Sequence, residues 1–507
     1  HNGSPQRARG AVYSVCDYGR VLSLWNIDDI ARLRTAFARA DLTRDGVASR
    51  RGANTLAALH RGDFRAMLAA TEDGDPQSTL LRLFTCGSIE SVEAVAAALD
   101  PFPVSEAVSA GLLVGEGSGY RAGMSLDFET GRWLLADLPA SPMRAVRADH
   151  VLGVSGASRS MSGYMLRREV EEAVDIGTGC GALALELAGH AGRVTATDVS
   201  SRALSFAATN AELNGEHWTL LAGDLLDPLQ DKRFDQIVCN PPFIVGPART
   251  DYDYRDAGRG GDGVCEELAR RIPAHLSPGG TAQFLANWVH VEGEDWRDRV
   301  ASWFADSGCD VWAIQRDVVD PLDYVRVWQR DAGGEHDPEA TAEWLGWFES
   351  NDIEAIGFGV INVRNAGACE PTVECEDIRQ QPAAAWDALI AAWFDAVRRL
   401  DALGPDGLLD ARLRVADGVA LHQQARHSKD GWEVDSQQVV DTAGVRRREE
   451  IDPLLVSLLG GCQGEATLRL QVDLLAQAHE APAALVAASL LPVVKRFVRH
   501  GYLEVVG

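Results

Sequence analysis

The chain has 507 residues, too many for one ordinary hydrophobic core, so we expect roughly two to four domains. Its 46% hydrophobic and 24% charged content is typical of globular proteins, and its apolar runs are too short to cross a membrane. Nine cysteines without a Cys-x-x-Cys pair argue against a zinc ribbon or a disulfide framework, and the first residues lack the apolar segment of a secretion signal. We therefore expect a cytoplasmic protein without a metal centre.

The net charge of −26 is concentrated in the middle of the chain. Residues 150–365 hold 18 basic and 35 acidic side chains, against 16 and 18 in residues 1–149 and 14 and 21 in residues 366–507. An acidic surface repels phosphate backbones, so the charge modestly disfavours a nucleic-acid substrate.

Residues 1–25 are interpreted as an N-terminal extension, and residues 26–145 predict a small helical domain. Apolar residues recur at the helical period in "DDIARLRTAFARA", and further short helical patterns follow. The stretch "GLLVGEGSGYRAGMSLDF" then alternates like two strands around the turn Gly117-Ser118-Gly119. Helices followed by a hairpin favour a winged-helix-like domain.

Residues 150–365 alternate between strand and helix patterns. The stretches "EEAVDIG" and "RVTATDV" are typical of buried strands, and each is followed by a helical pattern. This alternation predicts an α/β domain with a largely parallel, doubly wound sheet. We place the late strand pattern of residues 353–364 at the edge of that sheet.

Residues 366–507 predict a second small domain. The helical stripe Trp386, Ile390, Trp393 and Phe394 is expected to face a core. The last segment shows three helical patterns and a strand, which suits a second winged-helix-like domain. The cluster Arg446–Arg448 is followed at once by two glutamates, so we predict a solvated loop there.

A glycine-rich turn lies between the first strand and the first helix of the α/β block. The stretch "VDIGTGCGALALELA" contains Asp175, Gly177, Thr178, Gly179 and Gly181. Glycines let the backbone turn tightly and approach a ligand, although many such turns contain glycine. The spacing G-x-G-x-G also differs from the G-x-G-x-x-G of dinucleotide-binding folds.

Two further acids follow the next two predicted strands. Asp198 comes 21 residues after Gly177, near the spacing expected for an acid that binds a ribose diol. Asp224 ends the third strand, where an adenine edge would lie. Taken singly, each acid is as well explained as a helix cap or a turn residue. Acids at three consecutive strand ends favour a nucleotide-like cofactor.

The stretch "FDQIVCNPPFIVGP" ends the fourth strand abruptly in Asn240, Pro241, Pro242 and Phe243. Two prolines lack N–H groups and fix φ, so they neither continue a central strand nor sit inside a helix. The backbone after Asn240 is therefore stiff at the carboxyl end of a strand, the edge where open α/β sheets bind ligands.

These motifs, in this order, resemble the class I S-adenosylmethionine-dependent methyltransferases. The branch ending its fourth strand in Asn-Pro-Pro-Phe or Asn-Pro-Pro-Tyr is similar to release-factor glutamine methyltransferases and ribosomal-RNA guanine and adenine N-methyltransferases. The resemblance covers about residues 170–290 well and residues 290–365 by element order. The flanking segments resemble, more weakly, those of long actinobacterial methyltransferases. The resemblance implies a Rossmann-like, doubly wound, seven-stranded sheet with small domains on both sides.

The resemblance also implies a role for each motif. Its cofactor would be S-adenosyl-L-methionine, with S-adenosyl-L-homocysteine as product. Asp175 would engage the methionine amino group, the glycines and Thr178 would line the cofactor, and Asp198 would bind the ribose hydroxyls. Asp224, with Leu225 beside it, would face the adenine. The cofactor-binding set also includes Asn240, and the implied clamp on the acceptor is Asn240, Pro241, Pro242 and Phe243.

The chemistry of methyl transfer suits this clamp. The sulfonium is already a good leaving group, so the main task is to aim a nitrogen lone pair at the methyl carbon. The Asn240 side-chain oxygen and the Pro241 carbonyl can each accept one N–H of an NH2 group, which stabilises positive charge building on nitrogen. Phe243 offers a flat face to a planar group. This geometry also tolerates an oxygen acceptor.

Two other stretches are candidates for the pocket. The segment 250–262 follows the clamp, and its Tyr254, Arg255 and Asp262 are our further candidates for substrate binding. A plain solvated loop is the slightly favoured alternative for this segment. The segment 151–164 is rich in serine and glycine, and it is either a lid over the cofactor or an interdomain linker.

The sequence thus predicts an S-adenosylmethionine-dependent N-methyltransferase. We expect the acceptor to be an amide or amine nitrogen of a protein, a peptide or a small molecule. The first alternative is a ribosomal-RNA base N-methyltransferase, since an appended domain can recruit RNA. The second is an inactive scaffold that only binds the cofactor.

Overall fold

The computed structural model describes residues 22–61, 63–128, 130–139, 147–248, 258–331, 337–367, 370–429 and 431–506. The chain divides into two compact units. The first comprises residues 1–162, 168–296 and 319–356, and the second comprises residues 163–167, 297–318 and 357–507. Within the described ranges, no helix is long and apolar enough to cross a bilayer.

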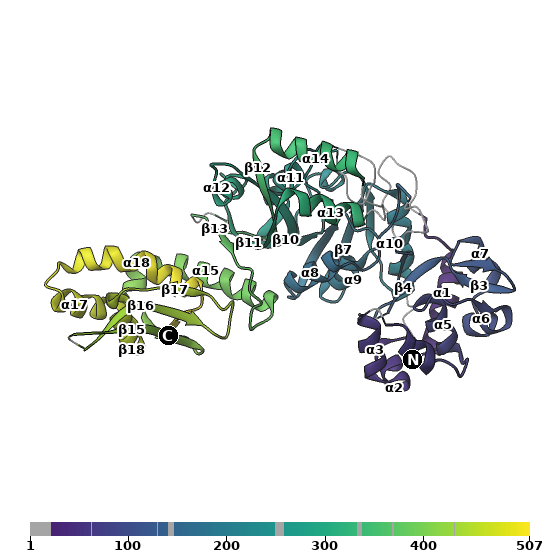
Figure 1. Ribbon diagram of the computed structural model, residues 1–507, viewed down its shortest axis with the longest axis horizontal. Coiled ribbons are helices and arrows are strands. Elements are labelled where there is room, and N and C mark those ends of the chain that lie inside the picture. Colours follow the sequence, from purple (N-terminus) through teal and green to yellow (C-terminus); the bar gives the residue numbers. More distant parts are fainter. Residues whose placement is uncertain are drawn as a thin grey trace, which may run out of the picture. The chain divides into compact units, whose positions relative to one another are not determined.

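The N-terminal part of the first unit is helical and carries two small antiparallel sheets, β1-β3-β2 and β4-β5 (Figure 1). Its helices are α1 (Ile27–Arg39), α2 (Arg44–Arg51), α3 (Ala53–His60), α4 (Arg65–Ala70), α5 (Pro76–Phe84), α6 (Val92–Leu99) and α7 (Val104–Ser109). Its strands are β1 (Glu90–Ser91), β2 (Leu113–Glu116), β3 (Gly119–Ala122), β4 (Met124–Asp127) and β5 (Leu134–Asp137). Strands β2 and β3 pair antiparallel, so the hairpin predicted around residues 117–119 is confirmed. The winged-helix-like character of both flanks stays a prediction.

The large sheet confirms the predicted Rossmann-like, doubly wound architecture. Its strands are β6 (Val170–Ile176), β7 (Ala191–Asp198), β8 (Thr219–Ala222), β9 (Phe234–Cys239), β10 (Leu276–Val291), β11 (Cys309–Val319), β12 (Ile353–Asn365) and β13 (Val373–Asp377). Their order is β13-β11-β12-β10-β9-β6-β7-β8. Strands β10, β9, β6, β7 and β8 run parallel, so the strand order reverses beside β6, where such sheets bind ligands.

Two details of the predicted sheet are wrong. The sheet has eight strands rather than seven, because β13 pairs in parallel with β11 at the edge. Strand β12, which we placed at the edge, lies between β11 and β10. Its buried Ile356, Val360 and Ile361 fit an interior position, since interior strands are covered by neighbours on both sides.

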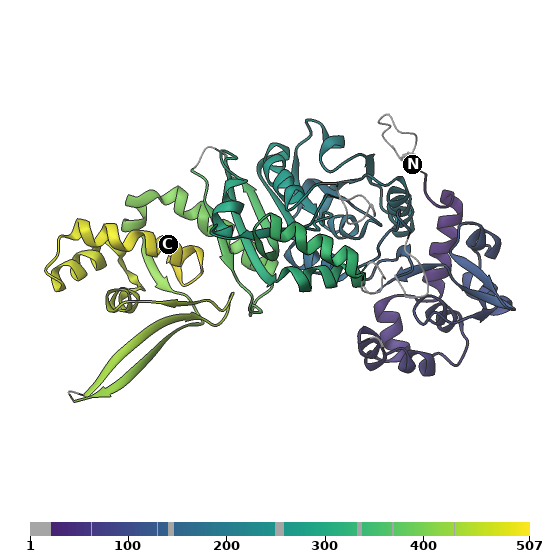
Figure 2. The ribbon, with the colours of Figure 1, turned by 45° about the horizontal axis from the view of Figure 1, so that its top comes forward.

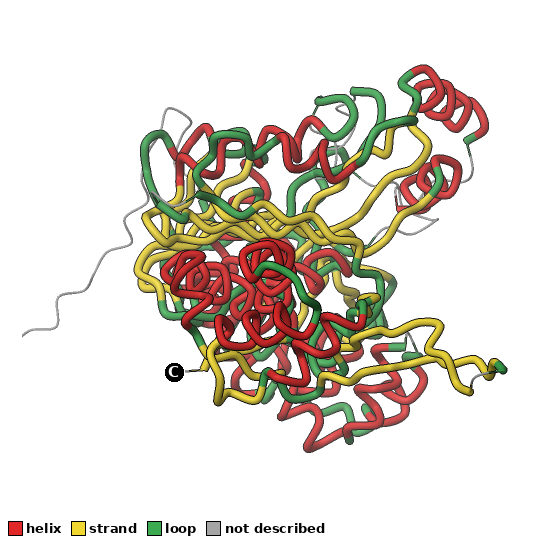
Figure 3. Tube along the Cα trace, turned by 90° about the vertical axis from the view of Figure 1, so that its left-hand side faces the viewer, coloured by secondary structure: helices red, strands yellow, loops and turns green. Residues whose placement is uncertain are grey.

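Helices cover both faces of the sheet, and Figure 3 shows its strands running side by side with helices above them. These helices are α8 (Gly156–Tyr164), α9 (Ala182–Leu187), α10 (Ser201–Asn214), α11 (Gly263–Arg271), α12 (Trp296–Ser302), α13 (Pro321–Asp331) and α14 (Pro338–Ser350). Helix α10 begins where the Ser200 hydroxyl accepts a hydrogen bond from Ala203 N–H, and it ends at left-handed Gly215. Its buried face carries Leu204, Phe206 and other apolar residues.

The C-terminal part of the second unit combines helices with two small sheets. Its elements are α15 (Trp386–Asp410), β14 (Arg412–Val415), β15 (Val419–Ser428), β16 (Gly431–Asp441), β17 (Arg448–Glu450), α16 (Pro453–Gly461), β18 (Gln463–Thr467), α17 (Leu468–Ala478), α18 (Ala483–Arg499) and β19 (Leu503–Val506). Ile390, Trp393 and Phe394 of α15 are buried, which confirms the core stripe for these three residues, whereas Trp386 is half-buried. The long hairpin β15–β16 was not predicted, and it extends away from α17 and α18 (Figure 2).

The solvated loop predicted at Arg446–Arg448 is wrong for its central residue. Arg447 is buried, its guanidinium lies over the Trp312 ring at 5.4 Å from the ring centroid, and it donates two hydrogen bonds to Glu376 at 2.9 and 2.7 Å. A charge run alone does not reveal such a partner, because Glu376 lies 71 residues away in the chain.

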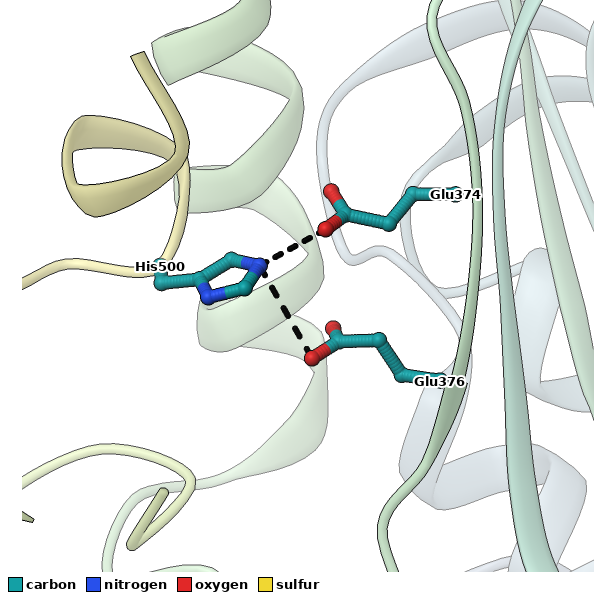
Figure 4. Close-up of side chains that lie close together, drawn as sticks. All are labelled: Glu374, Glu376 and His500. Carbon is teal, nitrogen blue, oxygen red and sulfur yellow. Dashed lines mark hydrogen bonds and ion pairs between the residues drawn. The ribbon is translucent and has the colours of Figure 1, made fainter. Parts of the chain in front are cut away.

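Buried His500 belongs to the same network (Figure 4). Its Nε2 lies 2.7 Å from Glu374 Oε1 and 3.7 Å from Glu376 Oε1, and its Nδ1 lies 2.9 Å from Glu449 Oε1. Each of the three carboxylates also pairs with a guanidinium; the pairs are Arg499–Glu374, Arg447–Glu376 and Arg496–Glu449. The cluster is therefore an ion-pair network that ties β13 to β17 and the end of α18, rather than a set of open metal ligands.

Candidate active site

A cavity opens at the carboxyl ends of β6, β7, β8 and β9, in the first unit. It brings together most of the motif residues that the sequence predicted for the cofactor. The predicted residues that line it are Asp175, Gly177, Thr178, Gly179, Asp198, Asp224, Leu225, Asn240 and Pro242. Residues from His150 to Ser158 line it too, so the serine-rich segment predicted at 151–164 contributes to the cavity.

The glycine turn after β6 needs its glycines for two different reasons. Gly177, Gly179 and Gly181 all have positive φ, at 67°, 56° and 90°, which L side chains rarely adopt. A Cβ on Gly181 would also lie 2.7 Å from the Trp218 ring, so the turn can pack this close to the ring only with glycine. Gly181 does not line the cavity, and its part is to support the turn. At Gly177 and Gly179 a Cβ would meet nothing within 4 Å, so the backbone there faces open space.

Asp175 is buried beneath this turn. Its Oδ2 accepts hydrogen bonds from Thr178 Oγ1 at 2.6 Å and from Ala184 N–H at 3.1 Å. Its Oδ1 is buried and has no hydrogen-bond partner among the described residues. Burial, aided by the negative charge of Asp198, raises the pKa of Asp175 to about 7, although the two hydrogen bonds act in the opposite direction. An unpaired carboxylate oxygen in this position suits a cationic ligand group.

Asp198 and Asp224 stand at the ends of β7 and β8. The carboxylate of Asp198 accepts hydrogen bonds from Gly179 N–H and Ser200 N–H, both at 2.8 Å, so it joins the glycine turn to the start of α10. Asp224 is half-exposed, and its Oδ2 accepts a hydrogen bond from Arg259 Nη2 at 2.9 Å. Leu225 follows with a φ of 44° and is buried at the cavity wall.

Asn240 presents the second unpaired acceptor of the cavity. Its Oδ1 is buried and lacks a hydrogen-bond partner in the part of the chain that the structure describes. Pro241 is buried, and Pro242 lines the cavity. Phe243 is half-buried and does not line the cavity, and its ring lies next to Trp328 with 6.3 Å between ring centroids.

Of the three remaining substrate candidates, the structure describes Asp262 alone, and this residue does not line the cavity. Tyr254 and Arg255 lie outside the described residues. Asp262 is buried at the start of α11, and its Oδ2 accepts a hydrogen bond from Val289 N–H of β10 at 3.2 Å. That contact anchors the helix to the sheet, so the structure gives Asp262 a supporting position.

Sequence reasoning missed several residues that shape the site. Asn210 of α10 donates hydrogen bonds to the carbonyls of Cys180 and Leu135, both at 2.8 Å, and so holds the glycine turn. Gly223 and Val199 line the cavity beside the predicted acids. A polar residue inside the apolar pattern of α10 was the available signal for Asn210. Arg259 lies in the segment 250–262 that we name as a candidate for the pocket, although Arg255 was the arginine chosen there.

The part of the chain that carries the motif residues of the cavity is also the part that resembles known methyltransferases. The family described as "Methyltransferase small domain" matches residues 156–289, and two families described as domains of unknown function, DUF7059 and DUF7782, match residues 39–123 and 391–505. A release factor glutamine methyltransferase of Geobacter sulfurreducens is 36% identical over 157 residues, 28% of this chain and 52% of that protein.

Two further relatives differ in what their names say they methylate. A ribosomal protein uL3 glutamine methyltransferase of Bradyrhizobium diazoefficiens is 39% identical over 124 residues, 22% of this chain and 39% of that protein. A ribosomal RNA small subunit methyltransferase C of Alcanivorax borkumensis is 30% identical over 129 residues, 25% of this chain and 36% of that protein.

The chain spans about half the length of the first of these relatives. The matched residues include the glycine turn, both acids and the Asn-Pro-Pro-Phe clamp, all of which meet at one edge of the sheet. Residues 156–289 therefore match the methyltransferase small domain family, and β9 within them ends in the Asn-Pro-Pro-Phe clamp.

Proposed function

We propose that the chain is an S-adenosylmethionine-dependent N-methyltransferase that acts on a side-chain amide of a protein. The observation that carries the proposal is a pair of buried, unpaired oxygens in one cavity, Asp175 Oδ1 and Asn240 Oδ1. An unpaired buried acceptor is costly, so each oxygen suits a donor that arrives with a ligand. One would receive an ammonium group and the other an amide N–H.

The residues around the cavity fit the cofactor. Asp175 would hold the amino group of S-adenosyl-L-methionine, and Gly177, Thr178 and Gly179 would let its chain approach the backbone. Asp198 would hold the ribose hydroxyls, while Asp224 and Leu225 would lie beside the adenine. When bound, the cofactor supplies an activated methyl group on a sulfonium, and S-adenosyl-L-homocysteine remains after transfer.

The clamp would orient the acceptor nitrogen. Asn240 Oδ1 would accept one N–H of the amide, and the Pro241 carbonyl would accept the other. Because the amide lone pair is delocalised, these bonds stabilise the positive charge that builds on nitrogen as the N–C bond forms. Pro242 fixes the backbone of the clamp, which would keep the acceptor nitrogen oriented toward the bound cofactor. The methylated nitrogen then loses one N–H proton to water, which leaves a neutral N-methyl amide.

Two observations support a protein acceptor over RNA. The relatives with 36–39% identity carry names of glutamine methyltransferases, whereas the RNA-methylating relative is 30% identical. The block of residues 150–365 also has 17 more acidic than basic side chains, which repels a phosphate backbone.

A label-transfer experiment tests the proposal. The purified chain is incubated with methyl-labelled cofactor and, separately, with unmethylated release factor, unmethylated ribosomal protein uL3 and unmodified ribosomal RNA. We expect label in a protein and a methylated amide in its peptides by mass spectrometry. Label in RNA alone would support the RNA alternative. Binding of S-adenosyl-L-homocysteine without transfer to any of these, or to a cell extract, would contradict an active enzyme.

A further inference from the structure

The segment that follows the clamp contacts aromatic residues of α13 and α14. Val245, five residues after Asn240, is fully buried, and its N–H donates a hydrogen bond to the Tyr324 hydroxyl at 2.7 Å. Asn287 Nδ2 donates to the same hydroxyl at 3.4 Å. Tyr324 itself is fully buried on α13, so this contact is made away from water.

The next residue is equally constrained. A Cβ on Gly246 would lie 2.7 Å from the Trp344 ring of α14, so only glycine lets the backbone pass this close. Gly246 O also accepts a hydrogen bond from Gly261 N–H at 2.9 Å, which ties the clamp segment to the start of α11. Residues 245 and 246 are thus fixed by α13, α14 and the approach to α11.

An aromatic corner stands beside this fixed segment. The rings of Phe243 and Trp328 lie 6.3 Å apart between centroids, with 66° between their planes. Trp328 also packs edge-on against Tyr324, with 5.8 Å between ring centroids, so Tyr324 contacts both this aromatic corner and Val245. Both Phe243 and Trp328 are only half-buried, which leaves part of each ring exposed.

We propose that α13 forms the acceptor wall of the methyltransferase, with Tyr324 as a positioning residue for the clamp and Trp328 as a specificity residue. This inference rests on the proposed function and names the class of acceptor. The corner of Phe243 and Trp328 receives the aliphatic stem of the amide side chain while Asn240 and Pro241 hold its NH2. A polypeptide amide on a flexible apolar stem therefore fits, because the stem would cover aromatic surface.

Loss of Tyr324 and loss of Trp328 should affect different kinetic constants. Without the Tyr324 hydroxyl, Val245 N–H would be buried without its partner, so the backbone after Asn240 would shift or loosen. Such a shift misaims the nitrogen in the transition state and lowers kcat. Loss of the Trp328 ring removes contact surface in the bound state and the transition state alike, which raises KM for the acceptor.

The positioning role is tested with Tyr324→Phe, with Tyr502→Phe as the matched control. Tyr502 is also fully buried, but its hydroxyl has no hydrogen-bond partner among the described residues. With the protein that takes label from the wild type as substrate, we expect Tyr324→Phe to lower kcat about tenfold, with cofactor KM changed less than about twofold. Tyr502→Phe should match the wild type. Equal kcat for Tyr324→Phe and wild type would overturn the role.

The specificity role is tested with Trp328→Ala and Trp328→Phe. We expect Trp328→Ala to raise the acceptor KM about tenfold, with a smaller change in kcat, and Trp328→Phe to restore most of the affinity. An unchanged acceptor KM in Trp328→Ala would overturn the role. A matching loss of cofactor affinity would also do so, because it would indicate a general disturbance of the domain.

Hydrogen exchange separates this inference from the proposed function. If the wild type transfers no label, the proposed function fails, yet exchange at Val245 still reports on the positioning contact. We expect faster exchange across residues 240–248 in Tyr324→Phe than in the wild type or in Tyr502→Phe. Equal exchange in all three proteins would overturn the positioning role whatever the activity.

Discussion

The raised pKa of Asp175 predicts that cofactor binding depends on pH. In the ligand-free protein the pKa of Asp175 is about 7, and the bound ammonium group requires its ionised form. About a tenth of the carboxyl groups are ionised at pH 6 and about nine-tenths at pH 8, so binding should weaken about tenfold from pH 8 to pH 6. In Asp175→Asn this dependence should disappear.

Calorimetric titration with S-adenosyl-L-homocysteine at pH 6, 7 and 8 measures the effect. The amino group of the ligand also titrates, but it does so identically with both proteins, so the difference between their profiles isolates Asp175. Circular dichroism first establishes that Asp175→Asn is folded. Parallel pH profiles for the two proteins would refute the assignment of Asp175 Oδ1 to the amino group.

The same shift has a consequence for stability. An unfolded aspartate ionises near pH 4, whereas folded Asp175 keeps its proton up to about pH 7, so the folded form binds more protons between these values. The free energy of unfolding of the ligand-free protein should therefore fall as pH rises from about 4 to about 7. Urea titrations at several pH values should show a flatter dependence for Asp175→Asn.

Two further predictions concern packing and the ion-pair network. Gly181→Ala should lower the free energy of unfolding by about 2–4 kcal/mol, because the residue has positive φ and an added Cβ would overlap the Trp218 ring. Gly293 also has positive φ but faces open space, so Gly293→Ala should lower it by only about 1 kcal/mol. Urea titrations measure both values. Burial alone would lower the pKa of His500, but hydrogen bonds to Glu374 and Glu449 raise it above its usual value. The contribution of protonated His500 to the free energy of unfolding should therefore persist at pH 6 and fade as pH rises through the raised pKa. His500→Gln should lower stability at pH 6 by about 3 kcal/mol and remove this alkaline loss, and an unchanged profile would contradict the network.

The sequence predicted which residues line the cavity at the carboxyl edge of the sheet because their signals are local. Asp175, the glycines and Asn240 follow apolar strands directly, and the parallel strand pattern alone places strand ends at one edge. The positions of Asp198 and Asp224 at the cavity followed from their place at the ends of consecutive strands, whereas their roles stay predictions.

Contacts between distant segments could not be predicted in this way. Arg447 is buried against Glu376 and Trp312, but its neighbours in sequence are typical of a solvated loop. Strand β13 is short and acidic, and it becomes a strand only by pairing with β11. Hairpin β15–β16 exposes residues on both faces over much of its length, so it lacks the alternation that marks a half-buried strand.

The central claim is that Asn240 orients the acceptor nitrogen, and a single comparison tests it. Methyl transfer to the identified protein acceptor and calorimetric binding of S-adenosyl-L-homocysteine are measured for Asn240→Ala and for the wild type. We expect the variant to lose about a hundredfold in kcat while its affinity for S-adenosyl-L-homocysteine stays within about threefold. Transfer at the wild-type rate by Asn240→Ala would contradict the account.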